Sequence, residues 1–269
     1  YREFGIAETA RRLDAEFALI IWDGQAGKMY AARDPIGIRP LFYGHSARDG
    51  SILFASEAKV LVDFCPEVRP FPPGHYYDGD GRFVAYREIS KVAAYHPHDT
   101  AQVLREIRER LVEAVRKRLH ADVPVAYLLS GGLDSSLVCG IANRILGKPL
   151  TTFAVGLNVN PIDLPHARKV AGFIGSDHHE VLFGRDDTLA CVPDVIRHTE
   201  TWDITTIRAS IGMYLVCRHI RGNSPVKVLL TGEVSDELFG YKYTDFAPDA
   251  EAFQRESVKR IDELHRYDV

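Results

Sequence analysis

The stretch that decides the fold reads Val123-Pro-Val-Ala-Tyr-Leu-Leu129, followed at once by Ser130-Gly-Gly-Leu-Asp-Ser-Ser136. It predicts an apolar strand that runs into a glycine-rich turn, and the turn opens a helix. Two glycines let the backbone approach a ligand closely, and the N–H groups at a helix start attract anions. We interpret the turn as a polyphosphate cradle in which Asp134 is placed to hold a metal ion. The alternative is a strand–turn–helix corner that uses glycine and serine for its geometry alone.

The composition is that of a soluble globular protein. The chain has 269 residues, of which 46% are hydrophobic and 26% charged, and its length suits two domains. The net charge of −4 gives no support to a nucleic-acid or anionic-membrane partner. No apolar run approaches the ~18 residues of a transmembrane helix. The cysteines are far apart in sequence, which favours reduced thiols in a cytoplasmic protein; they are Cys65, Cys139, Cys191 and Cys217.

The first part of the chain has the pattern of an antiparallel sheet. Over residues 13–88, apolar and polar residues alternate in short bursts separated by Gly, Pro and Asp. One short helix is expected over 55–61. The best linker candidate is 90–99, so we expect domains at 1–92 and 93–269. The predicted strands of the first domain are 17–22, 28–32, 41–43, 52–55, 75–77 and 83–86, with Asp80-Gly81 turning the last hairpin.

The second part alternates strands with helices. Thr100 is expected to cap an amphipathic helix that precedes the first strand. Apolar strands alternating with amphipathic helices predict a doubly wound parallel sheet, in which ligands lie beyond the carboxyl ends of the strands. The predicted strands are 123–129, 150–155, 179–183 and 226–230, and the helices after the glycine-rich turn include 164–174, 187–199 and 204–220.

A cluster of carboxylates follows the last of these strands, in the run Thr231-Gly-Glu-Val-Ser-Asp-Glu237. Three acidic side chains after a buried strand are costly unless a cation or a charged ligand compensates them. Asp134 and Asp236 follow two strands of one sheet, so we expect them to converge on a single Mg²⁺. Glu233 is then available to handle a proton. The alternative is an acidic first helical turn favoured by the helix dipole.

The run Thr201-Trp-Asp-Ile-Thr-Thr-Ile-Arg208 opens another helix, with Asp203 or Thr205 as its cap. Arg208 lies in the first turn, where the dipole disfavours a cation, and this suggests a carboxylate or phosphate partner. A salt bridge to the Glu233–Glu237 cluster is the structural alternative. Lys242 is a second candidate phosphate contact, with a solvated lysine as its alternative. His178 and His179 should point to opposite faces of a strand, which disfavours a shared metal.

Several motifs in order resemble the glutamine-dependent asparagine synthetase family. Besides Ser130–Ser136 they are Phe153-Ala-Val-Gly156, Thr205-Thr-Ile-Arg-Ala-Ser210, Gly232-Glu-Val-Ser-Asp-Glu237, and upstream Arg33-Asp-Pro-Ile-Gly-Ile-Arg-Pro-Leu-Phe-Tyr43, Ser56-Glu-Ala-Lys59 and Phe71-Pro-Pro-Gly74. The resemblance implies an α/β fold with an α+β first domain. That first domain would be the later part of an Ntn-type glutaminase, followed by part of a doubly wound PP-loop ATP pyrophosphatase domain.

The resemblance also implies a reaction and a set of site residues. ATP and Mg²⁺ activate the side-chain carboxylate of aspartate as an acyl-adenylate, pyrophosphate leaves, and ammonia derived from glutamine attacks to give asparagine. Glu233 and Arg208 would be catalytic, Thr205, Thr206 and Arg208 would shape the aspartate pocket, and Asp134 with Asp236 would hold Mg²⁺. The nucleotide-binding set would be Leu129, Ser130, Gly131, Gly132, Leu133, Asp134, Ser135, Ser136, Val155, Gly156, Thr231, Gly232 and Asp236.

The sequence departs from the family pattern at several places. Position 1 is Tyr where the family has its glutaminase Cys, and the chain stops at Val269 within a predicted helix, so we expect a piece of a longer polypeptide without glutaminase activity of its own. Val234 stands where the family usually has Gly, and only Gly240 precedes Tyr241, where two glycines are common. A β-lactam-synthetase-like enzyme and a nucleotide-binding paralogue without turnover are the alternative functions. The oligomeric state stays open, a homodimer included.

Overall fold

The computed structural model describes residues 1–91, 99–241 and 244–265, and the chain divides into two compact units. Unit 1 comprises Tyr1–Ala94, Glu200–Trp202 and Ala247–Val269, and unit 2 comprises Tyr95–Thr199 and Asp203–Phe246. The predicted boundary after residue 92 and most of the predicted linker 90–99 lie outside the described residues. The two units are therefore described one at a time.

Unit 1 contains two antiparallel sheets, as the alternating sequence predicts. The first sheet has the order β1-β2-β6-β7 and the second the order β4-β3-β5. Both sheets contribute side chains to one apolar core, among them Ala31, Leu41, Phe71 and Tyr77. The strands are β1 (Ala18–Asp23), β2 (Lys28–Arg33), β3 (Phe42–His45), β4 (Ile52–Ala55), β5 (Val68–Pro70), β6 (His75–Tyr77) and β7 (Phe83–Ala85).

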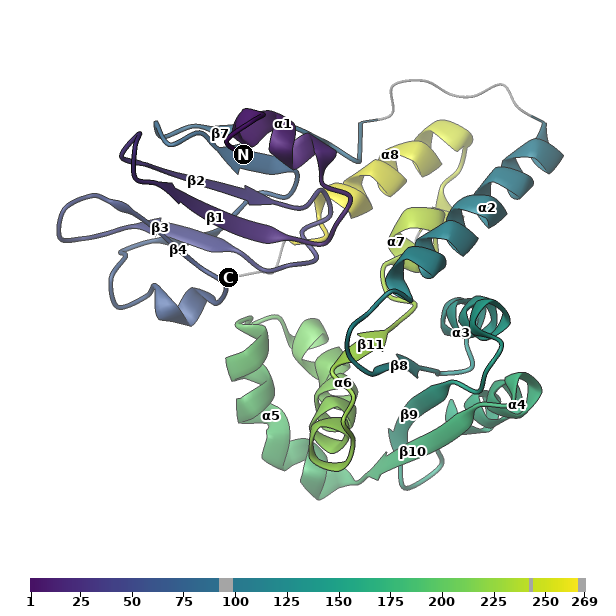
Figure 1. Cartoon of the computed structure of the whole chain (residues 1–269). Helices are drawn as coiled ribbons and strands as arrows, with labels where there is room; N and C mark the ends of the chain where they lie inside the picture. The colour runs from purple at the N-terminus through teal and green to yellow at the C-terminus, as the bar shows by residue number, and fades with distance from the viewer. Residues whose placement is uncertain (92–98, 242–243, 266–269) are drawn as a thin grey trace. The chain divides into compact units, whose positions relative to one another are not determined.

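Helices cover part of unit 1. Helix α1 (Gly5–Arg12), which the sequence analysis did not predict, packs Ile6 and Ala10 against Ala32 of the first sheet (Figure 1). The predicted short helix over 55–61 is only a single 3₁₀ turn, η1 (Ala58–Val60). Helix α8 (Ala250–Asp262) closes the described part of this unit. Strand β5 was also not predicted, because Val68-Arg-Pro70 is too short to show a period.

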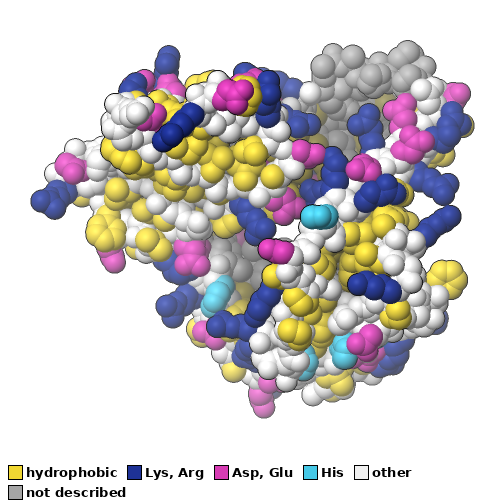
Figure 2. All heavy atoms as spheres, in the orientation of Figure 1, with side chains coloured by type: hydrophobic (Ala, Val, Ile, Leu, Met, Phe, Trp, Pro, Cys, Tyr) yellow, Lys and Arg dark blue, Asp and Glu magenta, His cyan; other side chains and the backbone are white. Residues whose placement is uncertain are grey.

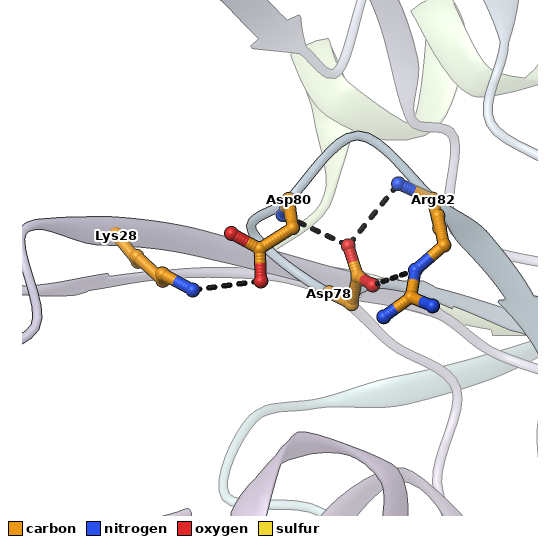
Figure 3. A network of polar contacts seen from close by, with 4 residues as sticks. All are labelled: Lys28, Asp78, Asp80 and Arg82. Atoms are coloured by element: carbon orange, nitrogen blue, oxygen red, sulfur yellow. Dashed lines mark hydrogen bonds and ion pairs between the residues drawn. The ribbon is translucent and has the colours of Figure 1, made fainter.

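A charged turn fixes the β6–β7 hairpin (Figure 3). The Asp78 carboxylate accepts hydrogen bonds from the backbone N–H groups of Asp80 and Arg82, at 2.8 and 3.1 Å, and from Arg82 Nε at 2.7 Å. Asp80 forms an ion pair of 2.7 Å with Lys28 of β2. These contacts join the turn to the neighbouring strand, so the predicted Asp80-Gly81 turn is confirmed.

Arg33 and Asp34 are buried, which explains one of the motifs in structural terms. The Arg33 guanidinium donates to the carbonyls of Gly37, Arg39 and Phe71, each at 2.8 Å. Asp34 accepts from four backbone N–H groups between residues 36 and 39, at 2.7–3.1 Å. The pair holds the loop after β2 in place, since buried charges are stable only when fully hydrogen-bonded.

Unit 2 is built on a four-stranded parallel sheet of order β10-β9-β8-β11. The chain order of the strands places β8 in the middle, with β9 and β10 on one side and β11 on the other. This is a doubly wound arrangement in which the order of strand addition reverses at β8. The strands are β8 (Val125–Leu128), β9 (Thr151–Leu157), β10 (Asp177–Phe183) and β11 (Val228–Leu230). The predicted α/β fold with an α+β first part is confirmed.

Helices lie on both faces of this sheet (Figure 1). On one face, α2, α3 and α4 pack Val115, Cys139 and Ala171 around Tyr127 and Leu129. On the other face, α6 packs against the sheet and α5 packs against α6. The helices are α2 (Thr100–Arg118), α3 (Leu133–Leu146), α4 (Leu164–Ile174), α5 (Arg185–Thr199), α6 (Ile204–Asn223), α7 (Ser235–Phe239) and the 3₁₀ turn η2 (Thr244–Phe246).

One predicted helix cap is wrong by a residue, and one of two alternatives is settled. The cap of α2 is Asp99, whose carboxylate accepts from Gln102 N, and Thr100 is the first helical residue. Aspartate is a strong cap because its acceptor is charged. For α6 the sequence left Asp203 and Thr205 open, and Asp203 is the cap.

The surface and the cysteines agree with the composition. On the face seen in Figure 2, Lys and Arg side chains are interspersed with Asp and Glu. None of the four cysteines forms a disulfide, and all but Cys217 are buried. Within the described ranges, no helix combines the length and the apolar character needed to cross a membrane.

Candidate functional site

The carboxyl ends of β8 and β11 share a cavity of about 230 Å³. Successive strands are added on one side of β8 (β9, β10) and then on the other (β11), so β8 is the topological switch point of the sheet. In a doubly wound fold, ligands bind at the carboxyl end of the strand at this switch point. Polar side chains and glycines from the two following loops form the walls. They are Ser130, Gly132, Asp134, Ser135, Gly232, Glu233, Val234, Ser235, Asp236 and Glu237.

The glycine-rich loop is held by its own hydroxyl groups. Ser130 Oγ lies 2.9 Å from Ser135 Oγ, and Gly132 N donates to Ser130 Oγ at 3.3 Å. Gly132 is the N-cap of α3, and no side chain in the described part of the structure caps this helix. The first N–H groups of α3 therefore face the cavity without a side-chain acceptor, which is the arrangement that favours an anion.

Two glycines bring neighbouring segments close to this loop. Gly131 has φ +85°, and a Cβ there would come within 2.4 Å of the carbonyl carbon of His166. A Cβ on Gly232 would come within 2.7 Å of Ser135 N and 2.8 Å of Asp134 Cβ. The loop after β8 thus lies against both α4 and the loop after β11, and a larger side chain at either glycine would separate these segments.

Four carboxylates line the cavity, from Asp134, Glu233, Asp236 and Glu237. Like charges around one small space repel each other, so a cation there is favourable. Carboxylate oxygens next to a phosphate-binding loop are the donor set that Mg²⁺ prefers. The two predicted metal residues, Asp134 and Asp236, do line the same cavity. The residues therefore fit a magnesium ion, although the described residues hold no ready-made cluster of three His, Cys, Asp or Glu ligands.

A second cavity, of about 180 Å³, shares part of its wall with the first. Ser130, Ser135, Gly232 and Glu233 line both. The remaining walls are mostly apolar: Leu128, Leu129, Phe153, Ala154, Val155, Asp163, Leu164, Met213, Val216 and Thr231. An apolar chamber beside a polar, acidic one suits a ligand with a flat hydrophobic part and a charged tail.

Val234 follows Glu233 in the acidic loop, at the N-cap position of α7, and has an unusual backbone conformation. Its φ of 71° and ψ of −1° are left-handed, a region that β-branched residues avoid. Ser235 Oγ donates to the carbonyl of Gly232 at 2.8 Å across this turn. The geometry that glycine would adopt easily is therefore kept in this chain with valine.

The structure brings most of the predicted nucleotide set to the two cavities but not all of it. Of that set, four residues line neither: Gly131, Leu133, Ser136 and Gly156. A Cβ on Gly156 would come within 2.8 Å of Leu164 Cγ, so this glycine, like Gly131, allows close packing. Leu133 is exposed, and the buried Ser136 hydroxyl has no hydrogen-bond partner among the described residues.

Unlike most of the predicted nucleotide-binding residues, the residues predicted to bind aspartate do not line either cavity. Thr205, Thr206 and Arg208 all lie at the start of α6 and line neither cavity. Thr206 donates from N and Oγ1 to Asp203, at 2.7 and 2.8 Å, and so completes the helix cap. Arg208 is exposed and makes no ion pair with a carboxylate of the described residues, so the alternative salt bridge is absent there.

Two further sequence candidates have simple outcomes. His178 and His179 do point to opposite faces: His178 Nδ1 lies 2.8 Å from Thr152 Oγ1, whereas His179 stacks on Phe153. Burial lowers the pKa of His178. Lys242 lies outside the described residues.

Sequence reasoning missed one polar residue of the second cavity, Asp163. It directly precedes α4 and has the pattern of an ordinary N-cap, so nothing in the sequence singles it out. The apolar walls from Met213 and Val216 were missed for a similar reason, since their spacing on α6 is that of core residues.

Comparison with known proteins identifies the family. A model described as asparagine synthase matches residues 106–266, which is more than half of the chain. The chain belongs to the asparagine synthase family. A model described as a glutamine amidotransferase domain matches residues 1–63. The predicted family resemblance is confirmed in both parts of the sequence.

Curated relatives of this asparagine synthase family chain support the same assignment. It is 41% identical to a probable glutamine-hydrolysing asparagine synthetase of Acanthamoeba polyphaga mimivirus, over 95% of this chain and 51% of that protein. It is 43% identical to a protein of the same description from Schizosaccharomyces pombe, over 100% of this chain and 51% of that protein. The chain thus spans about half the length of these relatives. A solved NH₃-dependent NAD synthetase from Campylobacter jejuni is 19% identical, covering 51% of this chain and 60% of its own, with a TM-score of 0.36.

Proposed function

We propose that this chain provides the adenylating site of a glutamine-dependent asparagine synthetase. The observation that carries the proposal is the joint lining of one cavity by the glycine-rich loop and the acidic loop, with Ser130 and Asp134 facing Glu233 and Asp236. Family membership supplies the expectation of an amide ligase, and the cavity supplies the groups that such chemistry needs.

The two cavities divide the nucleotide between them. The pyrophosphate end of ATP binds at the glycine-rich loop and the start of α3, where N–H groups without a side-chain cap can donate to phosphate oxygens. The adenosine end occupies the apolar chamber beside Leu129 and Val155. Asp134 and Asp236 would hold Mg²⁺, which would supply positive charge to the phosphates and to the pyrophosphate leaving group.

The reaction then proceeds in two balanced steps. A carboxylate oxygen of aspartate attacks the α-phosphorus of ATP, and the bond to pyrophosphate breaks. Ammonia attacks the resulting acyl carbon, AMP leaves, and the attacking nitrogen gives up a proton. Glu233, which borders both cavities, accepts that proton. The family resemblance assigns aspartate binding to Thr205, Thr206 and Arg208, which lie at the start of α6 and line neither cavity. The reduced, mostly buried cysteines are consistent with a cytoplasmic location for this chemistry.

The test is isotope exchange between pyrophosphate and ATP, measured on the full-length protein. We expect exchange that requires both aspartate and Mg²⁺, and a loss of at least about tenfold for Asp134→Asn and for Asp236→Asn, since each change removes one charged ligand. Asp177→Asn is the matched control, because Asp177 starts β10 at the opposite edge of the sheet and should leave exchange unchanged.

Two results would overturn the proposal. Exchange with a bulkier amino acid but not with aspartate would favour a β-lactam-synthetase-like enzyme. Tight ATP binding without exchange under any of these conditions would favour a nucleotide-binding paralogue, a candidate that the strained Val234 specifically motivates.

A further inference from the structure

The apolar cavity contains a carboxylate that the proposed function leaves unused. Two acidic residues line this cavity, Glu233 on the wall that it shares with the acidic cavity and Asp163 among the walls that it does not share. Asp163 is therefore separated from the Asp134 and Asp236 metal pair and lies on the nucleoside side of the proposed site. Asp163 is an exposed residue, so its carboxylate is open to solvent and accessible to a ligand that enters the apolar cavity.

Asp163 does not use its side chain to cap α4. It occupies the N-cap position, but its backbone is right-handed helical (φ −86°, ψ −30°), whereas a capping residue takes extended values so that its side chain can reach back. Its carbonyl accepts from His166 N and Ala167 N, each at 3.0 Å. In the described part of the chain the carboxylate has neither a hydrogen bond nor an ion pair.

The position of Asp163 is set by tight backbone packing. Leu164 and Ala167 of the first turn of α4 are completely buried. Gly131 of the glycine-rich loop lies so close that a Cβ would meet Ala167 N at 2.5 Å, and Gly156 at the end of β9 would meet Leu164. The start of α4 is thus fixed against both the glycine-rich loop and β9, so the backbone that carries Asp163 has a defined place beside the apolar cavity.

We propose that Asp163 recognises the ribose of the nucleotide by accepting hydrogen bonds from its 2′- and 3′-hydroxyl groups. An ionised carboxylate can only accept, which excludes a direct hydrogen bond to phosphate. Ribose lies between base and phosphates, and Asp163 lines the apolar chamber directly before the turn of α4 that packs against Gly131 of the glycine-rich loop. Carboxylates at the strand ends of other doubly wound nucleotide-binding folds bind ribose hydroxyls in this way. The inference rests on the proposed use of ATP and adds a specificity residue to it.

The test compares the binding of ATP and 2′,3′-dideoxy-ATP, each with Mg²⁺, to the full-length protein by equilibrium titration. Hydrogen bonds to a charged group predict that the unsubstituted protein binds ATP about 10- to 100-fold more tightly than the dideoxy analogue. In Asp163→Ala both nucleotides should bind equally, with the affinity that the unsubstituted protein has for the analogue. Asp163→Asn keeps an uncharged acceptor and should retain part of the preference.

Asp177→Ala removes a carboxylate at the opposite edge of the sheet and should keep the full preference for ATP. Circular dichroism of each variant establishes that it is folded. Equal binding of both nucleotides by the unsubstituted protein, or an unchanged preference in Asp163→Ala, would refute the ribose contact while leaving the proposed ATP site intact. A loss in Asp163→Ala that excess Mg²⁺ restores would refute it in favour of a metal ligand. Failure of the unsubstituted protein to bind ATP would remove both proposals.

Discussion

Val234 occupies a backbone conformation that is unfavourable for a β-branched side chain. A non-glycine residue in the left-handed region costs of order 1–3 kcal/mol and persists only where surrounding contacts impose it. Here the surrounding contacts are those of the acidic loop, including the hydrogen bond from Ser235 Oγ to the carbonyl of Gly232. The loop that carries Glu233 therefore keeps a left-handed backbone conformation at Val234, although valine disfavours that conformation.

Replacing Val234 with glycine should release this strain. We expect Val234→Gly to raise the free energy of unfolding by about 1 kcal/mol. Relief of the backbone strain stabilises the folded state, and the greater conformational entropy of glycine in the unfolded chain offsets part of this gain. Thermal and urea unfolding measure the change.

Asn160→Gly is the matched control, because Asn160 also has positive φ (50°) but asparagine tolerates this region. A stabilisation of Asn160→Gly as large as that of Val234→Gly would show that the valine strain is not the cause.

At the scale of elements, the contact between the glycine-rich loop and the first turn of α4 depends on one of two adjacent glycines. Gly131 has positive φ and backbone atoms of His166 and Ala167 where a side chain would go. Gly132 has φ −69°, and a Cβ there would only touch Ser130 Oγ at 3.4 Å. Gly131 is thus required for close packing against α4, whereas Gly132 is not.

The pair gives a direct mutational contrast. We expect Gly131→Ala to destabilise unit 2 by about 3 kcal/mol, through backbone strain and overlap with α4, and to abolish nucleotide binding. Gly132→Ala should cost about 1 kcal/mol or less, mainly through the poorer helix cap.

Urea unfolding and ATP titration of the two variants measure both effects. Equal effects of the two substitutions on stability would contradict the packing assigned to Gly131.

The elements of unit 2 were largely predictable, since β8, β9 and β11 contain apolar runs and the long helices carry apolar residues at helical spacing. Predictions failed where the local pattern is short or ambiguous. Val68–Pro70 has too few residues to show alternation, and α1 begins at Gly5 with Phe4 at the N-cap position, which makes no side-chain capping hydrogen bond. The cap of α2 shifted by one residue because Asp99 and Thr100 are both good caps and the charged one wins.

For the whole molecule, the division into two units predicts where a ligand acts. Every residue that lines the two cavities of the proposed ATP site belongs to unit 2. Ligand binding stabilises the part of a protein that contains the site, and local opening is then suppressed there.

Hydrogen exchange with and without Mg²⁺ and ATP tests this localisation. We expect slower exchange in the first turns of α3 and α4 and in the loop after β11, and unchanged exchange in strands β1 and β2 of unit 1. Protection of β1 and β2 equal to that of α3 would contradict a site confined to unit 2.

The sequence by itself determined most of the strands and the long helices, the glycine-rich loop and the acidic loop, because these depend on local periodicity and on residues a few positions apart. Only the tertiary structure decided which side chains surround the cavities. Asp163 joins the nucleotide side because tight packing at Gly131 and Gly156 fixes the start of α4 there. Thr205, Thr206 and Arg208 lie outside both cavities, at the start of α6, where Thr206 completes the helix cap with Asp203. Such choices depend on contacts between segments that are distant in sequence, and no local pattern records them.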